Sequence, residues 1–282
     1  MKDFKGKNIV ITGAGSGLGR CFANQFYQAG ACLALVDLDQ AGLEGTLQLT
    51  GDDGTRVKLF QVDVSDQAAM CQLAEDVVSQ LGPADILINN AGICLIPQSI
   101  EDTTDEQFEK VFNVNLWGAY YGIRAFLPQL KSRPEASIVN ISSLAGLVGL
   151  YGHGAYSVSK SALRGLSEVL QAELSATGVH VLLVHPGGVQ TNLIKNAPNL
   201  EKDRKEKAHK NFTDLSFLSP DKTVSRIIKA IRKKKNRAII GADARFILYM
   251  RALFPRRFPN MLRTIFSQAN FKDDPVWKTA KK

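Results

Sequence analysis

Short runs rich in β-branched and other apolar residues alternate with longer segments in which apolar residues recur every three to four positions. The first pattern is typical of buried strands and the second of amphipathic helices. Seven strands are predicted, at Asn8–Thr12, Cys32–Asp37, Val57–Val62, Asp85–Asn89, Ser137–Ser142, His180–His185 and Arg237–Ile240. Helices are predicted at Leu18–Ala29, Ala41–Leu49, Gln67–Leu81, Asp105–Leu130, Ala155–Ala176 and Thr223–Lys233.

The alternation of strands and helices predicts repeated βαβ units, and therefore an α/β fold. We expect a doubly wound, mainly parallel, seven-stranded sheet with helices on both faces. In such sheets ligands bind at the carboxyl ends of the strands, so functional motifs should follow strands directly. Nothing before about residue 190 suggests a domain boundary, and we expect residues 1–282 to form a single domain.

Composition narrows the class of protein. Of the 282 residues, 45% are hydrophobic and 22% are charged, which is the balance of a globular protein with a real core. The four cysteines form no C-x-x-C pair and have no histidine at metal-ligand spacing, so neither a metal site nor a disulfide framework is predicted. No apolar run is long enough to span a bilayer, and the first predicted strand leaves no room for a signal peptide. We therefore expect a cytoplasmic protein.

Charge is distributed unevenly along the chain. Residues 1–194 carry 12 basic and 19 acidic side chains, a net charge of −7, whereas residues 195–282 carry 23 and 8, a net of +15. Any surface that faces a polyanion should therefore be built from the last third. That third contains no recognised motif for reading nucleic acid, and we expect no nucleic-acid partner.

A glycine-rich loop follows the first predicted strand. It reads Thr-Gly-Ala-Gly-Ser-Gly-Leu-Gly over residues 12–19 and leads into a helical pattern. Glycines allow the backbone to approach a pyrophosphate closely, and the helix start offers N–H groups to it. The loop is thus a candidate dinucleotide site, although a plain tight turn is the alternative. The candidate binding residues are Gly13, Ser16, Gly17, Leu18 and Gly19.

Acidic residues end the second and third predicted strands. Asp37 lies where a carboxylate accepts hydrogen bonds from an adenosine ribose diol, and it would repel the 2′-phosphate of NADP. The sequence therefore favours NAD and disfavours NADP. Asp63 follows the third strand and is a candidate for the adenine side of the site. For both aspartates the alternative is a cap on the following turn.

Tyr156 and Lys160 lie four positions apart in a predicted helix, so both side chains project from one face. A nearby ammonium group favours the phenolate, which would tune the tyrosine for acid–base work. Ser143, 13 residues before Tyr156, follows the fifth strand and could donate to a carbonyl oxygen. A half-buried tyrosine beside a solvated lysine is the alternative.

Taken together, these motifs closely resemble those of the short-chain dehydrogenase/reductase family in its compact single-domain, Rossmann-fold form. The resemblance covers about residues 5–192. It rests on five motifs in the family's order: TGAGSGLG at 12–19, Asp37 with Asp63-Val64, NNAG at 89–92, Asn115 ahead of Ser143, Tyr156 and Lys160, and HPG at 185–187 with Thr191.

The resemblance implies a role for each matching residue. Tyr156 would be the general acid or base, Lys160 would hold the nicotinamide ribose and depress the tyrosine pKa, and Ser143 would polarise the substrate oxygen. Asn115 would kink its helix and hold a water in a proton relay. Ser142 is interpreted as a backbone-bonded core serine, and His153 and His185 as satisfied structural groups. The remaining cofactor-binding residues would be Val64, Asn90, Ala91, Gly92, Pro186, Gly187, Val189 and Thr191.

In the family the segment after the Pro-Gly motif forms a substrate lid, which would occupy 191–220 here. Its apolar residues favour a hydrophobic substrate: Leu193, Ile194, Phe212, Leu215 and Phe217. A basic apolar segment follows at 243–272, in which Pro255 and Pro259 should break a helical pattern. It could be part of the lid, an oligomer contact or a helix on a membrane surface.

The predicted function is NAD-dependent interconversion of a secondary alcohol and a ketone or aldehyde by hydride transfer. The expected substrate is hydrophobic: a steroid, a retinoid, or a lipid-derived or aromatic molecule. The resemblance implies a homodimer or homotetramer. The rival hypothesis is an NAD(H)-binding protein without turnover that engages a membrane or a partner through its basic C-terminal third.

Overall fold

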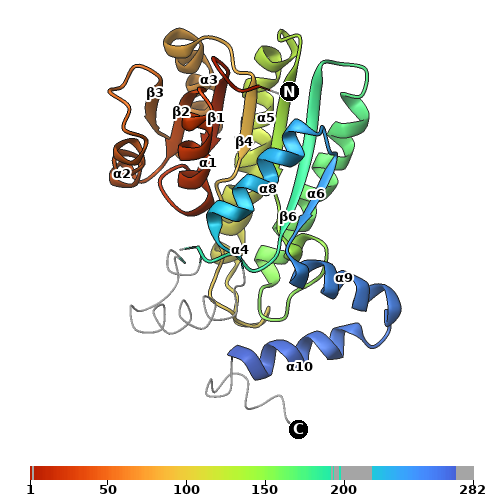
Figure 1. Cartoon of the computed structure of the whole chain (residues 1–282). Coiled ribbons are helices and arrows are strands. Elements are labelled where there is room, and N and C mark those ends of the chain that lie inside the picture. Colours follow the sequence, from red (N-terminus) through yellow and green to blue (C-terminus); the bar gives the residue numbers. More distant parts are fainter. Residues whose placement is uncertain (2, 192, 194–196, 198–217, 271–282) are drawn as a thin grey trace.

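A seven-stranded parallel sheet runs through the molecule in a computed structural model of the chain (Figure 1). The structure describes residues 1, 3–191, 193, 197 and 218–270. The strand order is β3-β2-β1-β4-β5-β6-β7, and every pair of neighbours is parallel. The strands are β1 (Asn8–Thr12), β2 (Cys32–Asp37), β3 (Val57–Gln61), β4 (Ile86–Asn89), β5 (Ala136–Ile141), β6 (Val179–Pro186) and β7 (Arg237–Ile240). The predicted strands are confirmed to within one residue at each end.

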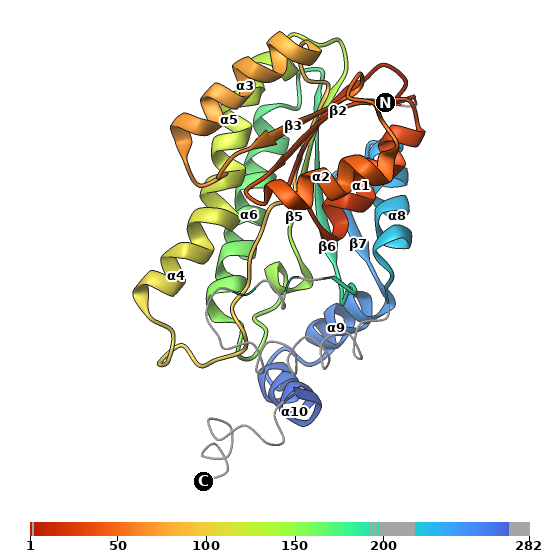
Figure 2. The same cartoon turned by 90° about the vertical axis from the view of Figure 1, so that its left-hand side faces the viewer.

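Helices cover both faces of the sheet, as predicted (Figure 2). On one face lie α1 (Gly17–Gln28), α2 (Gln40–Thr50) and α8 (Pro220–Arg232). On the other lie α3 (Gln67–Leu81), α5 (Gly118–Lys131) and α6 (Gly154–Glu173), and α4 (Asp105–Phe112) precedes α5. The doubly wound Rossmann architecture expected from the sequence is therefore the architecture of the chain.

Two hydrophobic cores hold these layers together. Phe22 and Phe26 of α1 and Ile227 of α8 are fully buried or nearly so against one face of the sheet. Phe126 of α5 and Met70 of α3 pack against the other face. The central strands are buried on both faces, which explains why they read as nearly continuous apolar runs.

The helix predicted as continuous over Asp105–Leu130 is interrupted. A π-helical turn, η1 (Asn113–Trp117), separates α4 from α5. Such turns insert a residue into the helical ladder and often occur at functional sites. The kink expected at Asn115 is therefore present, and it turns that side chain into the interior, where only 1% of the residue is exposed.

The C-terminal part of the described chain adds two helices, α9 (Ala242–Leu253) and α10 (Phe258–Asn270). Pro255 lies in the break between them, as predicted. Pro259 does not break the pattern: it is the second residue of α10, where proline is tolerated because the first helical N–H groups have no partner within the helix. None of the described helices is both long and apolar enough to cross a membrane.

Candidate active site

The site begins where the chain changes direction across the sheet. Strand β1 lies between β2 and β4, so the chain moves outward to β3 and then returns to the other side of β1. The carboxyl ends of β1 and β4 are tied together by Thr12, whose hydroxyl accepts from the N–H groups of Asn90 and Ala91 at 3.1 Å each. The Asn90 amide donates in turn to the carbonyls of Thr12 and Gly13. Such switch points are where open α/β sheets bind ligands.

The glycine-rich loop packs too tightly for side chains. Gly13 has a φ of +66°, and a Cβ there would lie 2.9 Å from the Cα of Ala91. A Cβ on Gly19 would lie 1.9 Å from the carbonyl oxygen of Gly13. Ser16 is the N-cap of α1 but makes no capping bond with its side chain. The loop and helix start thus have the form of a phosphate cradle, with Leu18 in the first turn of α1.

Asp37 ends β2 beside this loop. One carboxylate oxygen accepts from the N–H of Gly15 at 2.8 Å, and the other accepts from the N–H of Asp39 at 3.0 Å. The guanidinium group of Arg20 is nearby but is already engaged with Thr46 and the carbonyls of Gly15 and Gly42. The bond from Asp39 agrees with the alternative of a turn cap, and the part of Asp37 in binding an adenosine ribose stays a prediction. Arg20 is held in place by its other contacts.

Asp63 and Val64 follow β3. Asp63 is exposed and accepts from the backbone and hydroxyl of Ser65 at 2.8 and 2.7 Å, so it caps its own turn. Val64 is buried and packs against Gly118 at the start of α5, where a Cβ would come within 2.7 Å of it. The contacts of Asp63 agree with the alternative of a turn cap, and its part in binding adenine stays a prediction.

Asn115 joins the loop after β4 to the catalytic helix. Its side chain accepts from the N–H of Ile93 at 2.8 Å and donates to the carbonyl of the same residue at 2.9 Å. It also donates to the hydroxyl of Ser159 at 3.0 Å. Gly92 leaves room here, because a Cβ would lie 3.2 Å from both the Asn115 amide oxygen and the Lys160 ammonium. The π-helical turn thus places Asn115 beside Lys160.

Lys160 is only 3% exposed. Its ammonium group donates to the carbonyl of Ile141 at 3.0 Å, and no carboxylate pairs with it among the described residues. Burial lowers the pKa of Lys160 to about 8. A buried cation without an acidic partner is costly and is most often found at functional sites.

Tyr156 lies on the same face of α6 as Lys160, whose ammonium is 5.8 Å from the centre of the phenol ring. Burial raises the pKa of Tyr156 above its ordinary value, whereas a hydrogen bond between its phenol and the Ser143 side chain acts to lower it. The sequence led us to expect that Lys160 depresses this pKa. In the structure desolvation is the largest effect on this pKa, and Tyr156 is therefore a protonated acid at neutral pH.

Ser143 caps the short 3₁₀ helix η2 (Leu144–Gly146), and its hydroxyl accepts from the N–H of Ala145 at 3.1 Å. Ser142, by contrast, donates to the carbonyl of Lys160 at 3.0 Å, which confirms its interpretation as a backbone-bonded core serine. Of the two, Ser143 is thus the one that reaches the tyrosine.

His185 belongs to this site, although we interpreted it as a satisfied structural group. Its Nδ1 lies 2.9 Å from the carbonyl oxygen of Ser143, and its buried Nε2 has no partner in the described structure. Burial lowers the pKa of His185 to about 4, so the ring is neutral and Nδ1 carries the proton that it donates. The sequence signal was its position at the end of β6, next to β5, which leads to Ser143.

The Pro186-Gly187 motif connects the site to the C-terminal helices. The N–H of Gly188 donates to the Asp243 carboxylate of α9 at 2.7 Å, and a Cβ on Gly187 would collide with that carboxylate. Thr191 lies against the glycine loop, 3.5 Å from where a Cβ on Gly17 would be. Val189 is buried and bridges to Leu218. The end of this motif therefore lies against the glycine loop, and its place around the nicotinamide stays a prediction.

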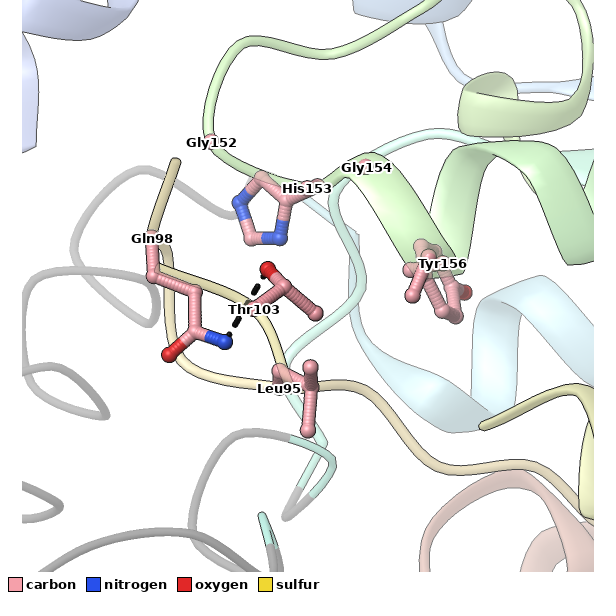
Figure 3. Close-up of a pocket in the computed structure, with 8 residues that line it drawn as sticks. Leu95, Gln98, Thr103, Gly152, His153, Gly154 and Tyr156 are labelled. Carbon is pink, nitrogen blue, oxygen red and sulfur yellow. Dashed lines mark hydrogen bonds between the residues drawn. The ribbon is translucent and has the colours of Figure 1, made fainter. Parts of the chain in front are cut away.

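A small hollow, partly open to solvent, adjoins Tyr156 (Figure 3). Its wall combines Leu95 with Gln98, Thr103 and His153, and the amide of Gln98 donates to the Thr103 hydroxyl at 3.1 Å. Burial lowers the pKa of His153 to about 4, so this histidine is neutral. The hollow offers substrate both apolar and hydrogen-bonding surface next to the tyrosine.

Cys94 is a neighbour of the site that sequence reasoning did not single out. It is buried, its thiol donates weakly to the carbonyl of Leu193 at 3.6 Å, and burial raises its pKa to about 12. The thiol is therefore protonated and apolar in character. Among the described residues no cluster of metal-ligating side chains occurs. The other lid residues predicted to contact substrate, Ile194, Phe212, Leu215 and Phe217, lie outside the described residues.

A parallel sheet with a glycine-rich loop after β1, an aspartate at the end of β2 and a serine–tyrosine–lysine set around a buried ammonium group defines the class of dinucleotide-dependent oxidoreductases. The family model for short chain dehydrogenase matches residues 7–202. SadH of Mycobacterium tuberculosis, described by its name as an oxidoreductase, is 35% identical over 251 residues, which cover 88% of this chain and 90% of SadH. Human estradiol 17-beta-dehydrogenase 11 is 32% identical, with 93% of this chain and 84% of the relative covered.

Solved structures agree with this assignment. A short chain dehydrogenase/reductase from Burkholderia phymatum, in complex with NAD, has a TM-score of 0.82 and 28% identity, and the match covers 93% of this chain and 97% of that one. The chain therefore belongs to the short-chain dehydrogenase/reductase family, whose members are oxidoreductases that act on CH–OH groups with a nicotinamide cofactor.

Proposed function

We propose that this protein is an NAD-dependent dehydrogenase that interconverts a hydrophobic secondary alcohol and the corresponding ketone or aldehyde. One observation carries the proposal. Ser143, Tyr156 and Lys160, which come from the loop after β5 and from α6, lie together at the carboxyl edge of the sheet beside the glycine loop. A purely structural role would not require an unpaired ammonium group to be buried there.

The chain's own residues would handle the proton. Tyr156, protonated at neutral pH, donates its proton to the carbonyl oxygen during reduction and takes it back during oxidation. Ser143 donates a hydrogen bond to the same oxygen and stabilises the charge that develops there. Lys160 stabilises the phenolate that forms when the proton leaves. The nicotinamide ring, when bound, supplies or accepts the hydride.

The residues that would hold the cofactor fit a dinucleotide. Pyrophosphate would bind the glycine loop between Gly13 and Gly19, where side chains are sterically excluded. The carboxylate of Asp37 would accept from the ribose diol, and it favours NAD over NADP because a 2′-phosphate would meet a like charge. The nicotinamide end would lie near Asn90, Gly92 and the Pro186–Thr191 loop.

A hydrophobic substrate is supported by two observations. Leu95 and buried Cys94 lie beside Tyr156. The name of the human relative, estradiol 17-beta-dehydrogenase 11, refers to a steroid, which is a hydrophobic molecule. Steroids, retinoids and lipid-derived or aromatic alcohols are therefore the substrates to test first.

The protein would work in the cytoplasm as a homodimer or homotetramer. Helices α5 and α6 lie on the same side of the molecule (Figure 2). Val158 and Val169, three turns apart on α6, are exposed, and so is Trp117, directly before α5. Large apolar side chains exposed on one face are typical of protein interfaces, and this face is the proposed subunit contact. We further infer a peripheral contact with membranes through the C-terminal segment.

The experiment that tests the function is turnover of NAD against secondary alcohols graded by size and apolarity. Tyr156→Phe removes only the proton carrier and should reduce kcat roughly a hundredfold to ten-thousandfold while NADH still binds. Tyr27→Phe, on α1 far from the site, is the matched control and should leave turnover unchanged. If Tyr156→Phe is as active as the wild type, or if no alcohol is oxidised although NADH binds, the proposal is wrong.

A further inference from the structure

Helix α9 carries an apolar stripe on its outer side. Phe246, Tyr249 and Leu253 are spaced three and four residues apart, so they project from one face of the helix, and Phe254 continues the stripe at its end. Their exposed fractions are 59%, 62%, 51% and 43% respectively. We call these four residues the α9 apolar face.

The α9 apolar face is not needed to hold the helix in place. The inner side of α9 is also apolar: Ala244 is buried, and Ile247 and Leu248 pack with Phe258 and Leu262 of α10 against the loop that follows Ser143. The helix is therefore anchored without its outer side. Large apolar side chains that are exposed to solvent and have no packing role indicate a surface that binds a partner or a membrane.

Arginines flank the α9 apolar face. Arg245, Arg256 and Arg257 are exposed, and Arg245 also donates to the carbonyl of Ile239 at 3.5 Å. Arg251 donates to the carbonyl of Leu147 and ties α9 to the active-site loop. Over residues 241–264 the one acidic side chain, Asp243, is engaged by the N–H of Gly188. The surface around the apolar face is therefore cationic as well as hydrophobic.

The combination of apolar and cationic side chains favours one of the two candidate binding partners, a second copy of the chain or a lipid bilayer. A second copy of the chain meeting it about a two-fold axis would bring like-charged arginines together, which opposes association. A bilayer surface that contains anionic lipids offers opposite charge to the arginines and an apolar interior to the aromatic rings. Tyrosine and phenylalanine beside arginine are the side chains expected at that boundary.

The surface also has a specific position relative to the site. Helices α9 and α10 lie at the carboxyl end of the sheet, the same end as the loop after β5 (Figure 1). Leu144 and Leu147, which follow Ser143, pack in one cluster with Ala244 of α9. The run Lys233–Lys235, after α8, lies at the other end of the sheet and is not part of this surface.

We propose that the α9 apolar face, with Arg245, Arg256 and Arg257, docks the protein on the surface of an anionic lipid bilayer. The docked orientation holds the substrate entrance against the membrane, so that an apolar alcohol passes from the lipid to Tyr156 without crossing water. This second step rests on the proposed function, whereas the docking itself does not.

The docking is tested by flotation of the full chain with vesicles of phosphatidylcholine, with and without phosphatidylserine, in the absence of cofactor and substrate. The wild type should float only with the phosphatidylserine vesicles, and added salt should release it. The triple variant Phe246→Ser, Tyr249→Ser, Leu253→Ser and the double variant Arg256→Glu, Arg257→Glu should each bind at least about tenfold more weakly, because partitioning needs both apolar insertion and charge.

Matched control variants distinguish binding through the α9 apolar face from nonspecific binding of the protein to vesicles. Leu49→Ser and Val78→Ser remove exposed apolar residues of α2 and α3, and Lys233→Glu with Lys235→Glu changes the same amount of charge at the other end of the sheet. All should bind vesicles like the wild type.

Several outcomes would overturn the docking proposal: no flotation of the wild type, equal loss in the controls, or binding that the α9 variants do not change. A fourth is a change of oligomeric state in the triple variant without a change in flotation, which would assign the face to a second copy. Turnover of the graded secondary alcohols, measured in parallel without vesicles, tests the dehydrogenase activity separately. A chain that floats but does not turn over alcohol would therefore refute the proposed function and leave the docking intact.

Discussion

The ring of His185 donates a hydrogen bond to the backbone carbonyl of Ser143, with 2.9 Å between Nδ1 and the oxygen. The two residues are 42 positions apart, and they meet because β5 and β6 are neighbours with Ile141 paired to Val184. His185 therefore fixes the main chain of the serine whose hydroxyl reaches Tyr156. It is a positioning residue, since no contact between its ring and the phenol is found in the described structure.

His185→Leu should lower kcat by about tenfold with little change in the KM of the cofactor, because one hydrogen bond that orients Ser143 is lost. His185→Asn should recover most of the activity, since the asparagine amide can donate from a position close to that of Nδ1. Steady-state kinetics on the three proteins, with thermal unfolding to confirm folding, measures this. Equal losses in both variants would show that the hydrogen bond has no part in positioning.

The same histidine should make folding sensitive to acid. Burial lowers the pKa of His185 to about 4, below an unfolded value of about 6.5. For a depressed pKa the stabilising contribution is present above the unfolded value and is lost as the pH falls through the folded one. The free energy of unfolding should therefore decrease between about pH 6.5 and 4, by up to about 3 kcal/mol from His185 alone.

Urea unfolding of the wild type, His185→Asn and His180→Asn across this range checks the assignment. His180 lies at the other end of β6 and is more exposed, so its variant should keep most of the slope. The free energy of unfolding of His185→Asn should depend less on pH than that of the wild type. If its profile is parallel to that of the wild type, other groups such as half-buried His153 govern the acid limit.

Part of this fold and site could be predicted from the sequence, and part could not. The strand positions could be predicted from apolar runs, because parallel strands that are buried on both faces are apolar at nearly every position. The kink at Asn115 was expected only from the family resemblance. The contact of His185 was missed because its partner is a backbone carbonyl, so only the position of the histidine at the end of β6 indicated it. The raised pKa of Tyr156 was missed because desolvation depends on packing around α6.

The pH dependence of the two reaction directions should differ. Burial raises the pKa of Tyr156, so the phenol that reduction requires is present through neutral pH, whereas the phenolate that oxidation requires increases as pH rises. The pKa of Lys160 is lowered to about 8, so the cation that stabilises the phenolate is lost above that value. Oxidation should therefore accelerate with pH and level off near pH 8, and reduction should be flat until alkaline pH.

Profiles of kcat for both directions with one alcohol–ketone pair measure this. Lys160→Met should abolish the plateau near pH 8 and slow oxidation more than reduction, because only the phenolate loses its nearby cation. An oxidation rate that is highest in acid would contradict the assignment of Tyr156 as the base.

Cofactor choice should depend on Asp37. Its carboxylate accepts a hydrogen bond from the N–H of Gly15 in the glycine loop at 2.8 Å, while the guanidinium of Arg20 is bound to Thr46 and to the loop backbone. Asp37→Ser removes the negative charge but keeps a hydroxyl, so the ratio of kcat/KM for NADP over NAD should rise by about tenfold or more. The ratio is the quantity to compare, because losing the hydrogen bond to Gly15 lowers kcat/KM for NAD and for NADP alike.

Asp39→Ser is the control: it removes a neighbouring exposed carboxylate and should leave the ratio of kcat/KM for NADP over NAD unchanged. A wild-type enzyme that uses NADP as well as NAD, or an Asp37→Ser variant with an unaltered ratio, would show that selectivity is set elsewhere in the site.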